Sequence, residues 1–196
     1  MWCTYSLFEN SSNQYQSLNS IRPTTHTHRY KYMGKKTKFS AILEKCPLDS
    51  LLRFHIHTTE NTLYCMGAQS RKLKRNMEKM RVVVDCSGFY VGLFGKAAIR
   101  FLSNVASLDQ KHYIERLESV FVINAPWSLT FAWNVVRKWL DDRTREKVQI
   151  MGKPKEWKPV LEKYFDRDQI PYCYGGENRG PSARAFAVAL EAEEEK

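Results

Sequence analysis

Two short β-branched runs constrain the fold of this chain more than any other feature. Residues 82–88 read VVVDCSG and residues 120–126 read VFVINAP, and each run ends abruptly in polar residues, glycine or proline. Parallel strands that are buried in a sheet have this pattern where they leave it. An alternating segment at 29–33 and a third run at 147–151, closed by Gly152, predict two further strands.

Amphipathic segments separate these predicted strands. Their apolar residues recur at spacings of three and four, which is typical of helices. Strands that alternate with helices indicate βαβ units with right-handed crossovers. The fold class is therefore predicted to be α/β, with a mainly parallel sheet flanked by helices. The helices are expected at 39–46, from Pro47 onward, at 93–105, at 128–140 with Ser128 as N-cap, and at 155–164.

Length and composition predict one folded domain between two polar ends. A chain of 196 residues is the size of a single domain, and 43% of its residues are apolar. Residues 1–28 are polar and aperiodic, so they are expected to form a disordered arm. Residues 29–176 are expected to form the domain and residues 177–196 a tail with an acidic end.

The cysteines and the apolar runs predict a cytoplasmic protein. The five cysteines show no C-x-x-C spacing, which favours reduced thiols over disulfides or a zinc site. No apolar run approaches the roughly 18 residues of a membrane-spanning helix. The first residues also lack the basic and apolar regions of a secretory signal.

The net charge of +10 is concentrated in the first part of the chain. Residues 1–81 carry 14 Lys and Arg against five Asp and Glu, whereas the rest is nearly balanced. A basic surface of this kind suits an anionic membrane leaflet, a nucleic acid, or solubility alone. Because no aromatic residues interleave with the run at 71–75, a solvated helix end is preferred there and no nucleic-acid partner is expected.

Polar side chains at the strand ends and in one helix are candidates for chemistry. Asp85 and Cys86 follow a predicted strand, but no phosphate-binding loop or nucleophile elbow accompanies them, so structural roles are favoured and no enzyme is predicted. His55 and His57 lie in a helical pattern, where positions i and i+2 diverge. We therefore expect no metal site.

The segment 127–140 carries more apolar surface than a surface helix needs. Its apolar residues cover nearly the whole helical circumference, and it is too short to cross a bilayer. Two interpretations remain open from the residues alone. The helix is either part of the core, or it packs on the sheet while its other face lines an apolar cavity or touches lipid.

Four blocks of the chain resemble, in order and spacing, the CRAL-TRIO lipid-binding domain family, to which the yeast phosphatidylinositol transfer protein belongs. The blocks are 81–88 (RVVVDCSG), 113–126 (YIERLESVFVINAP), 139–152 (WLDDRTREKVQIMG) and 168–176 (DQIPYCYGG). The resemblance implies a sheet that floors an apolar lipid pocket closed by a gate helix. The resemblance covers residues 29–176. It does not extend to the helical N-terminal subdomain that relatives usually carry before this region, because residues 1–28 do not resemble that subdomain.

The resemblance also implies residues for the two ends of a lipid. It places 127–140 at the gate, with Phe131, Val135 and Trp139 as gate or pocket residues. It aligns three polar residues with the lipid head group. A Glu–Lys ion pair that is purely structural is the alternative for two of them. The head-group candidates are Glu115, Thr144 and Lys147.

The function implied by the resemblance is non-enzymatic binding, and transfer between membranes, of a single amphiphilic lipid. The expected ligand is a phospholipid such as phosphatidylinositol or another hydrophobic small molecule, with no cofactor besides it. Transient contact with a membrane surface is expected. The alternative function is a protein-interaction scaffold of the same fold that exchanges no lipid.

Overall fold

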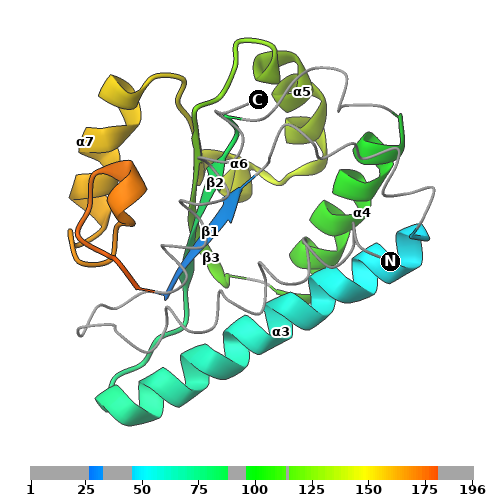
Figure 1. The fold of residues 1–196 in the computed structure, drawn as a ribbon. Helices are drawn as coiled ribbons and strands as arrows, with labels where there is room; N and C mark the ends of the chain where they lie inside the picture. The colour runs from blue at the N-terminus through cyan, green and yellow to red at the C-terminus, as the bar shows by residue number, and fades with distance from the viewer. Residues whose placement is uncertain (1–26, 33–45, 88–95, 114, 181–196) are drawn as a thin grey trace.

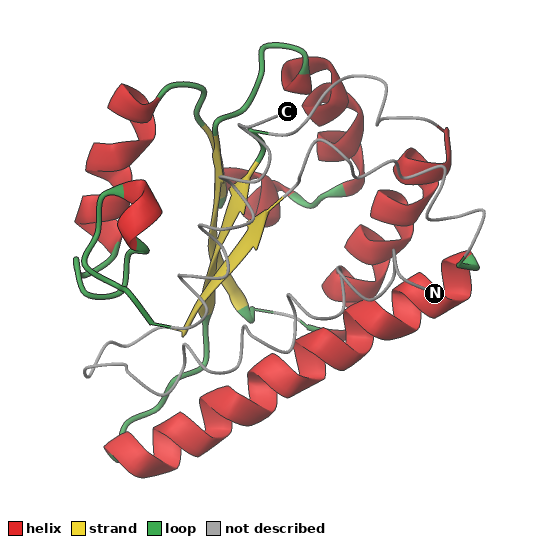
Figure 2. Ribbon diagram, in the orientation of Figure 1, coloured by secondary structure: helices red, strands yellow, loops and turns green. Residues whose placement is uncertain are grey.

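A parallel four-stranded sheet organises the computed structural model, which describes residues 27–32, 46–87, 96–113 and 115–180. Its strands lie side by side in the order in which they occur along the chain (Figure 2). The predicted parallel sheet is confirmed. The strands are β1 (Thr27–Tyr32), β2 (Met80–Asp85), β3 (Leu117–Ile123) and β4 (Val148–Ile150).

The helices confirm the predicted alternation and add short elements that periodicity did not indicate. The predicted helix at 39–46 lies outside the described residues apart from Cys46. Ser128 is the N-cap residue of α5 as predicted, but its backbone is already helical and its side chain accepts no capping hydrogen bond. The helices are α3 (Leu48–Leu73), α4 (Lys96–His112), α5 (Leu129–Val136), α6 (Asp142–Glu146) and α7 (Pro154–Tyr164), with the 3-10 turns η3 (Arg137–Trp139) and η4 (Tyr172–Tyr174).

The order of the strands determines which face each helix covers. When parallel strands follow one another in sequence order, right-handed crossovers all pass over the same face of the sheet. Figure 1 shows α3, α4 and α5 on one side of the sheet and α7, with the turn η4 beside it, on the other. We call these the crossover face and the α7 face.

The α7 face carries the closed core of the domain. Side chains from β2 and β3 meet α7 and the segment that contains η4, and all of them are at most 5% exposed. Aromatic rings supply much of this core; those of Phe121 and Phe165 meet edge to face with centroids 5.5 Å apart. The core residues are Val83, Phe121, Ile123, Trp157, Leu161, Phe165, Ile170 and Tyr174.

The crossover face is only partly closed. At one end, Met66 of α3 packs on Met80 and Val82. Toward β4 the apolar side chains are half-buried, whereas the sequence predicts fully buried strands. In parallel register, partner residues point to the same face, so four of these side chains form one apolar surface. This surface, which we call the apolar floor, consists of Val120 and Val148, which are register partners, and Val122 and Ile150, which are also partners.

A buried hydrogen-bond network fastens η4 to the carboxyl end of β2. The Asp85 carboxylate accepts hydrogen bonds from the Tyr174 hydroxyl at 2.6 Å, the Asn124 amide at 3.0 Å and the Ser87 backbone N–H at 2.8 Å. Burial of the hydroxyl, together with the Asp85 charge, raises the pKa of Tyr174. Asp85 is therefore a structural residue with three hydrogen-bond partners.

Arg81 belongs to the fold as well, although the sequence places it at the end of the basic first part. Its guanidinium pairs with Glu118 at 3.0 Å and lies over the rings of Tyr164 and Phe165. Only 14% of its side chain is exposed. The Arg81 charge therefore stabilises the packing of β2, β3 and α7 and does not form part of an exposed basic surface.

Replacing Tyr174 by Phe tests the buried network. Removing the hydroxyl leaves a buried carboxylate oxygen without its partner, so we expect Tyr174→Phe to lower the free energy of unfolding by about 2 kcal/mol. Tyr64→Phe is the control, because Tyr64 is 73% exposed on α3. Urea denaturation measures both. A Tyr174→Phe variant as stable as the control would contradict the role of the network.

Candidate functional site

The connection between β3 and β4 spans the crossover face next to the apolar floor. It leaves β3 where the Ala125 N–H donates to the Met151 carbonyl at 3.0 Å, and it rejoins the sheet where the Val120 N–H donates to the Lys147 carbonyl at 2.9 Å. Residues 125–147, which we call the strap, therefore run from the carboxyl ends of the strands back to the amino end of β4. The strap contains α5, η3 and α6.

The first half of the strap is an apolar helix with two different faces. Leu129, Trp133 and Val136, at helical spacing, are half-buried, and Leu129 packs with Val84, Val122 and Cys86. The opposite face is apolar too, but exposed. The exposed stripe consists of Trp127 (79% exposed), Phe131 (66%) and Val135 (39%).

The predicted gate residues thus lie in two different environments. Phe131 and Val135 belong to the exposed stripe, where the rings of Phe131 and Trp127 meet edge to face at 5.8 Å. Trp139 is half-buried in η3 and borders a groove against α4. The structure brings Trp127 and Phe131 together. Trp127 is not among the gate residues predicted from the sequence.

The second half of the strap is polar and is organised by Asp141. The Asp141 carboxylate accepts hydrogen bonds from the Thr144 backbone N–H at 2.9 Å and from the Thr144 hydroxyl at 2.7 Å. This is the N-cap of α6. The two hydrogen bonds hold the pKa of Asp141 below its usual value. The predicted head-group residue Thr144 is therefore oriented by its neighbour on the strap.

Glu115 and Lys147 lie at the amino ends of the adjacent strands β3 and β4. Lys147 is half-buried at the end of α6, where its backbone N–H donates to the Thr144 carbonyl at 3.2 Å. The Glu115 carboxylate lies 3.9 Å from the Arg143 guanidinium, which draws it toward α6. Its ion partner in the described part of the chain is thus Arg143, so the alternative of a structural Glu115–Lys147 pair finds no support there.

Glu115 also has an unusual backbone conformation. Its φ is +60°, in the left-handed region, which costs a residue with a side chain about 1–2 kcal/mol. Such strain is often retained where a side chain serves a function. Its side chain is 69% exposed, so burial does not explain the conformation.

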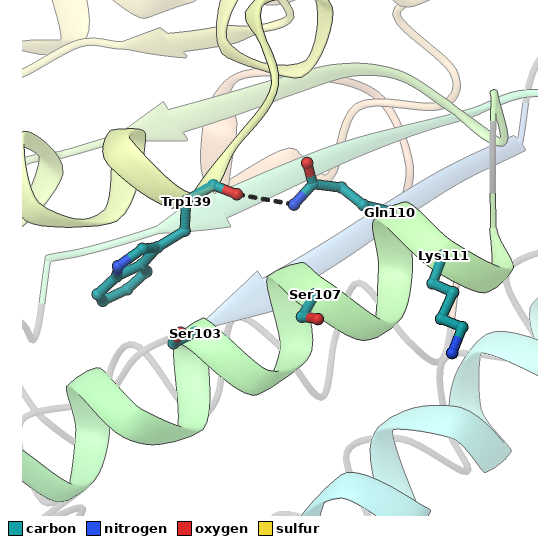
Figure 3. Close-up of a pocket in the computed structure, with 5 residues that line it drawn as sticks. All are labelled: Ser103, Ser107, Gln110, Lys111 and Trp139. Atoms are coloured by element: carbon teal, nitrogen blue, oxygen red, sulfur yellow. Dashed lines mark hydrogen bonds between the residues drawn. The ribbon is translucent and has the colours of Figure 1, made fainter.

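A groove of about 480 Å³ lies between α4 and η3 (Figure 3). The side chain of Gln110 crosses this groove from α4. Its N–H donates to the Trp139 carbonyl at 2.8 Å, and its oxygen accepts a hydrogen bond from the Asp141 N–H at 3.0 Å. No sequence pattern marked this glutamine, since a polar residue near a helix end is ordinary. The groove is lined by Ser103, Ser107, Gln110, Lys111 and Trp139.

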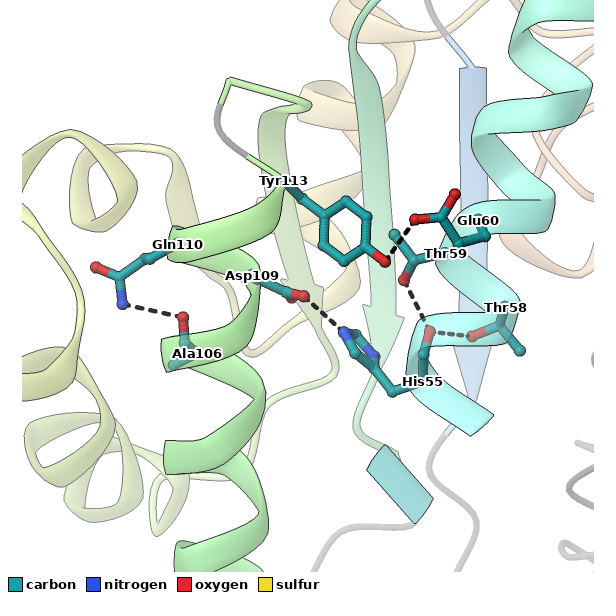
Figure 4. Close-up of polar contacts among 8 residues, drawn as sticks. All are labelled: His55, Thr58, Thr59, Glu60, Ala106, Asp109, Gln110 and Tyr113. Atoms are coloured by element: carbon teal, nitrogen blue, oxygen red, sulfur yellow. Dashed lines mark hydrogen bonds and ion pairs between the residues drawn. The ribbon is translucent and has the colours of Figure 1, made fainter. Parts of the chain in front are cut away.

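Two polar contacts hold α4 against α3, as Figure 4 shows. The His55 ring lies 2.7 Å from the Asp109 carboxylate, and the Tyr113 hydroxyl donates to Glu60 at 2.8 Å. His57 bonds instead to Asn61 on its own helix, so the two histidines diverge as predicted. Within the described ranges, no three His, Cys, Asp or Glu residues gather as metal ligands would.

Cys86 is a poor candidate for a nucleophile. It is 2% exposed and packs against apolar neighbours. Burial, with the adjacent Asp85 charge, raises the pKa of its thiol to about 12. The thiolate that such chemistry needs is therefore scarce at neutral pH.

The fold and the strap together define a class of protein. It is an α/β domain whose sheet is closed on one face, while a strap with an apolar half and a polar half spans the other. The chain matches the family model of the CRAL/TRIO domain over residues 21–176, and it belongs to that family. Among the described residues, no helix has the length and apolar character needed to cross a membrane.

Known proteins similar to the chain agree with this assignment. It is 25% identical over 136 residues to the phosphatidylinositol/phosphatidylcholine transfer protein SFH7 of Arabidopsis thaliana, covering 69% of this chain and 24% of that protein. It is 30% identical over 115 residues to the Sec14 cytosolic factor of Schizosaccharomyces pombe, covering 58% and 39%. The chain therefore spans well under half the length of these relatives.

The fold has a counterpart among solved structures. A crystal structure of Sfh5 superposes with a TM-score of 0.57 at 20% sequence identity. The superposition covers 66% of this chain and 45% of that one. At this identity the likeness concerns the fold alone.

Replacing Asp141 by Ala tests the cap of α6. Loss of an N-cap side chain costs about 1 kcal/mol, so Asp141→Ala should lower the free energy of unfolding by that amount at pH 7. Because folding lowers the pKa of Asp141, its stabilising contribution is present above the unfolded-state pKa of about 3.9 and disappears as the pH falls through the lower folded value.

The pH dependence supplies the control for this variant. The difference in unfolding free energy between wild type and Asp141→Ala should be present at pH 7 and should shrink as the pH falls below 4. Urea denaturation of the two proteins at pH 7 and at a pH below 4 measures this difference. A difference that stays constant with pH would contradict the ionised cap.

Proposed function

We propose that this domain binds one phospholipid, with phosphatidylinositol as the preferred ligand, and exchanges it at membrane surfaces without covalent chemistry. The observation that carries the proposal is the half-buried apolar floor beside a strap that is apolar at one end and polar at the other. An amphiphilic lipid is likewise divided into an apolar part, its acyl chains, and a polar part, its head group. Its chains match the floor and α5, and its head group matches α6.

Burial of acyl chains would supply most of the binding free energy. The apolar floor is made of Val120 and Val122 of β3 with Val148 and Ile150 of β4, and the half-buried residues of α5 extend it. Each CH₂ group removed from water contributes about 0.8 kcal/mol. A lipid held in this way leaves slowly unless the strap moves, which is the role the proposal gives to α5 as a gate.

The polar half of the strap would select the head group. The Lys147 ammonium and the Thr144 hydroxyl suit phosphate oxygens, and the Glu115 carboxylate suits inositol hydroxyls. The left-handed backbone of Glu115 supports its role. The Thr144 hydroxyl donates its single proton to Asp141 in this structure, so on lipid binding it would turn from Asp141 to the phosphate. SFH7, to which the chain is similar, is a phosphatidylinositol/phosphatidylcholine transfer protein, and this agrees with a phospholipid ligand.

The exposed stripe on α5 would make the transient contact with the membrane. Trp127 and Phe131 form an aromatic pair at the surface, and aromatic side chains favour the membrane–water interface. The exposed Arg137 and Lys138 follow on the same segment and suit anionic lipids. The protein would thus work in the cytoplasm and touch membranes only during exchange.

Lipid extraction from the purified, folded protein tests the proposed function. Mass analysis should find phosphatidylinositol near one molecule per chain. Another single lipid would keep the binding and overturn the assigned head group. No lipid at all would overturn the proposal and favour the protein-interaction scaffold.

Removing the Lys147 charge tests the head-group site. We expect Lys147→Ala to weaken phosphatidylinositol loading about tenfold or more, because a charge-assisted hydrogen bond is lost, while phosphatidylcholine loading stays nearly unchanged. Lys155→Ala, on the opposite face in α7, is the matched control. Equal loss of both lipids would make Lys147 structural.

Polar substitutions in the exposed stripe test membrane contact. We expect the double variant Trp127→Ser, Phe131→Ser to bind anionic vesicles several-fold more weakly in a sedimentation assay, because its aromatic anchors are gone. Tyr64→Ser removes a comparably exposed aromatic residue from α3 and should bind like wild type. Equal binding by all three proteins would show that the stripe does not face the membrane.

A further inference from the structure

Gln110 holds the strap at the point where its apolar and polar halves meet. Its side-chain oxygen accepts the Asp141 N–H, and its NH₂ group donates to the carbonyls of Trp139 at 2.8 Å and Ala106 at 3.0 Å. Both donors of the amide are therefore used. The hydrogen bond to Ala106 fixes the side chain on its own helix, α4. The other two hydrogen bonds join this fixed side chain to the strap.

The end of α4 that carries Gln110 is held in turn by the neighbouring helix α3. Asp109 and Tyr113, on either side of Gln110, bind His55 and Glu60 of α3. The last turn of α4 is therefore held against a helix 26 residues long, which packs on the sheet through Met66. Gln110 connects this rigid layer to the turn between η3 and α6.

The contact reaches Thr144 through a short chain of hydrogen bonds. Gln110 positions the Asp141 backbone, and the Asp141 carboxylate holds both the backbone N–H and the hydroxyl of Thr144. A displacement of the turn would therefore displace the hydroxyl. On the other side of the turn, Gln110 holds η3 through the Trp139 carbonyl.

We propose that Gln110 is a positioning residue for head-group selection: it anchors the turn at 139–141, so that α5 can move as a gate while Thr144 stays in place. The inference rests on the proposed function. It predicts that Gln110 affects the discrimination between phosphatidylinositol and phosphatidylcholine, whereas a residue that only stabilises the fold would affect both lipids equally.

Two substitutions of similar size separate these roles. Gln110→Met removes every side-chain hydrogen bond. Gln110→Glu keeps an acceptor for the Asp141 N–H, but at pH 7 its carboxylate faces two carbonyl oxygens and cannot donate to them. Protonation restores one donor as the pH falls toward the reference carboxyl pKa of about 4.3. Ser107→Ala, in the same groove, is the matched control.

The experiment measures loading of the full chain from vesicles that contain phosphatidylinositol and phosphatidylcholine, at pH 7 and pH 4, together with amide hydrogen exchange. At pH 7 both Gln110 variants should lose about tenfold in preference for phosphatidylinositol, whereas Ser107→Ala keeps it. At pH 4, where most of a carboxyl group with the reference pKa carries its proton, Gln110→Glu should recover preference and Gln110→Met should not. In Gln110→Met, exchange should accelerate at Asp141 and Thr144 and remain slow in the sheet.

Other outcomes overturn the inference in distinguishable ways. A wild-type protein that loads neither lipid removes the proposed function and the inference with it. A wild type that prefers phosphatidylinositol, with Gln110 variants that prefer it equally, overturns the inference alone. Parallel loss of both lipids, with faster exchange throughout the sheet, would show that Gln110 only stabilises the fold.

Discussion

The handedness of the crossovers is the constraint on which the rest of this structure depends. Since the four strands follow one another in order, every right-handed connection must cover the same face, and only α7 is left for the other. α7 and η4 close their face with aromatic rings and with the buried Asp85–Tyr174 network. The crossover face, beside β3 and β4, stays half-open.

The polarity of the strap follows from where it begins and ends. Its α5 half leaves the carboxyl end of β3 with apolar side chains on both faces, and its α6 half reaches β4 with an Asp–Thr cap and a terminal lysine. Gln110 grips the turn between them. One connection therefore carries an apolar surface, a fixed turn and a polar site in that order, which is the arrangement an amphiphile requires.

The sequence predicted the fold well and the local geometry less well. β-branched runs and helical spacing located the strands and the long helices, because those patterns report directly on burial. They could not show that Val120 and Val122 are only half-buried, since burial depends on how the helices of the crossover face pack on the sheet. The apolar surplus of 127–140 was visible, but periodicity did not assign Phe131 outward. Gln110 left no signal, because its role depends on a backbone 29 residues away.

The central claim is that acyl chains lie on the apolar floor, and photochemical labelling tests it most directly. The protein would be loaded with phosphatidylinositol that carries a diazirine in one acyl chain, irradiated and digested. The account predicts that the label attaches to peptides that contain residues 120–123 and 148–151. Labelling confined to Trp127 and Phe131, or to the α7 face, would contradict it.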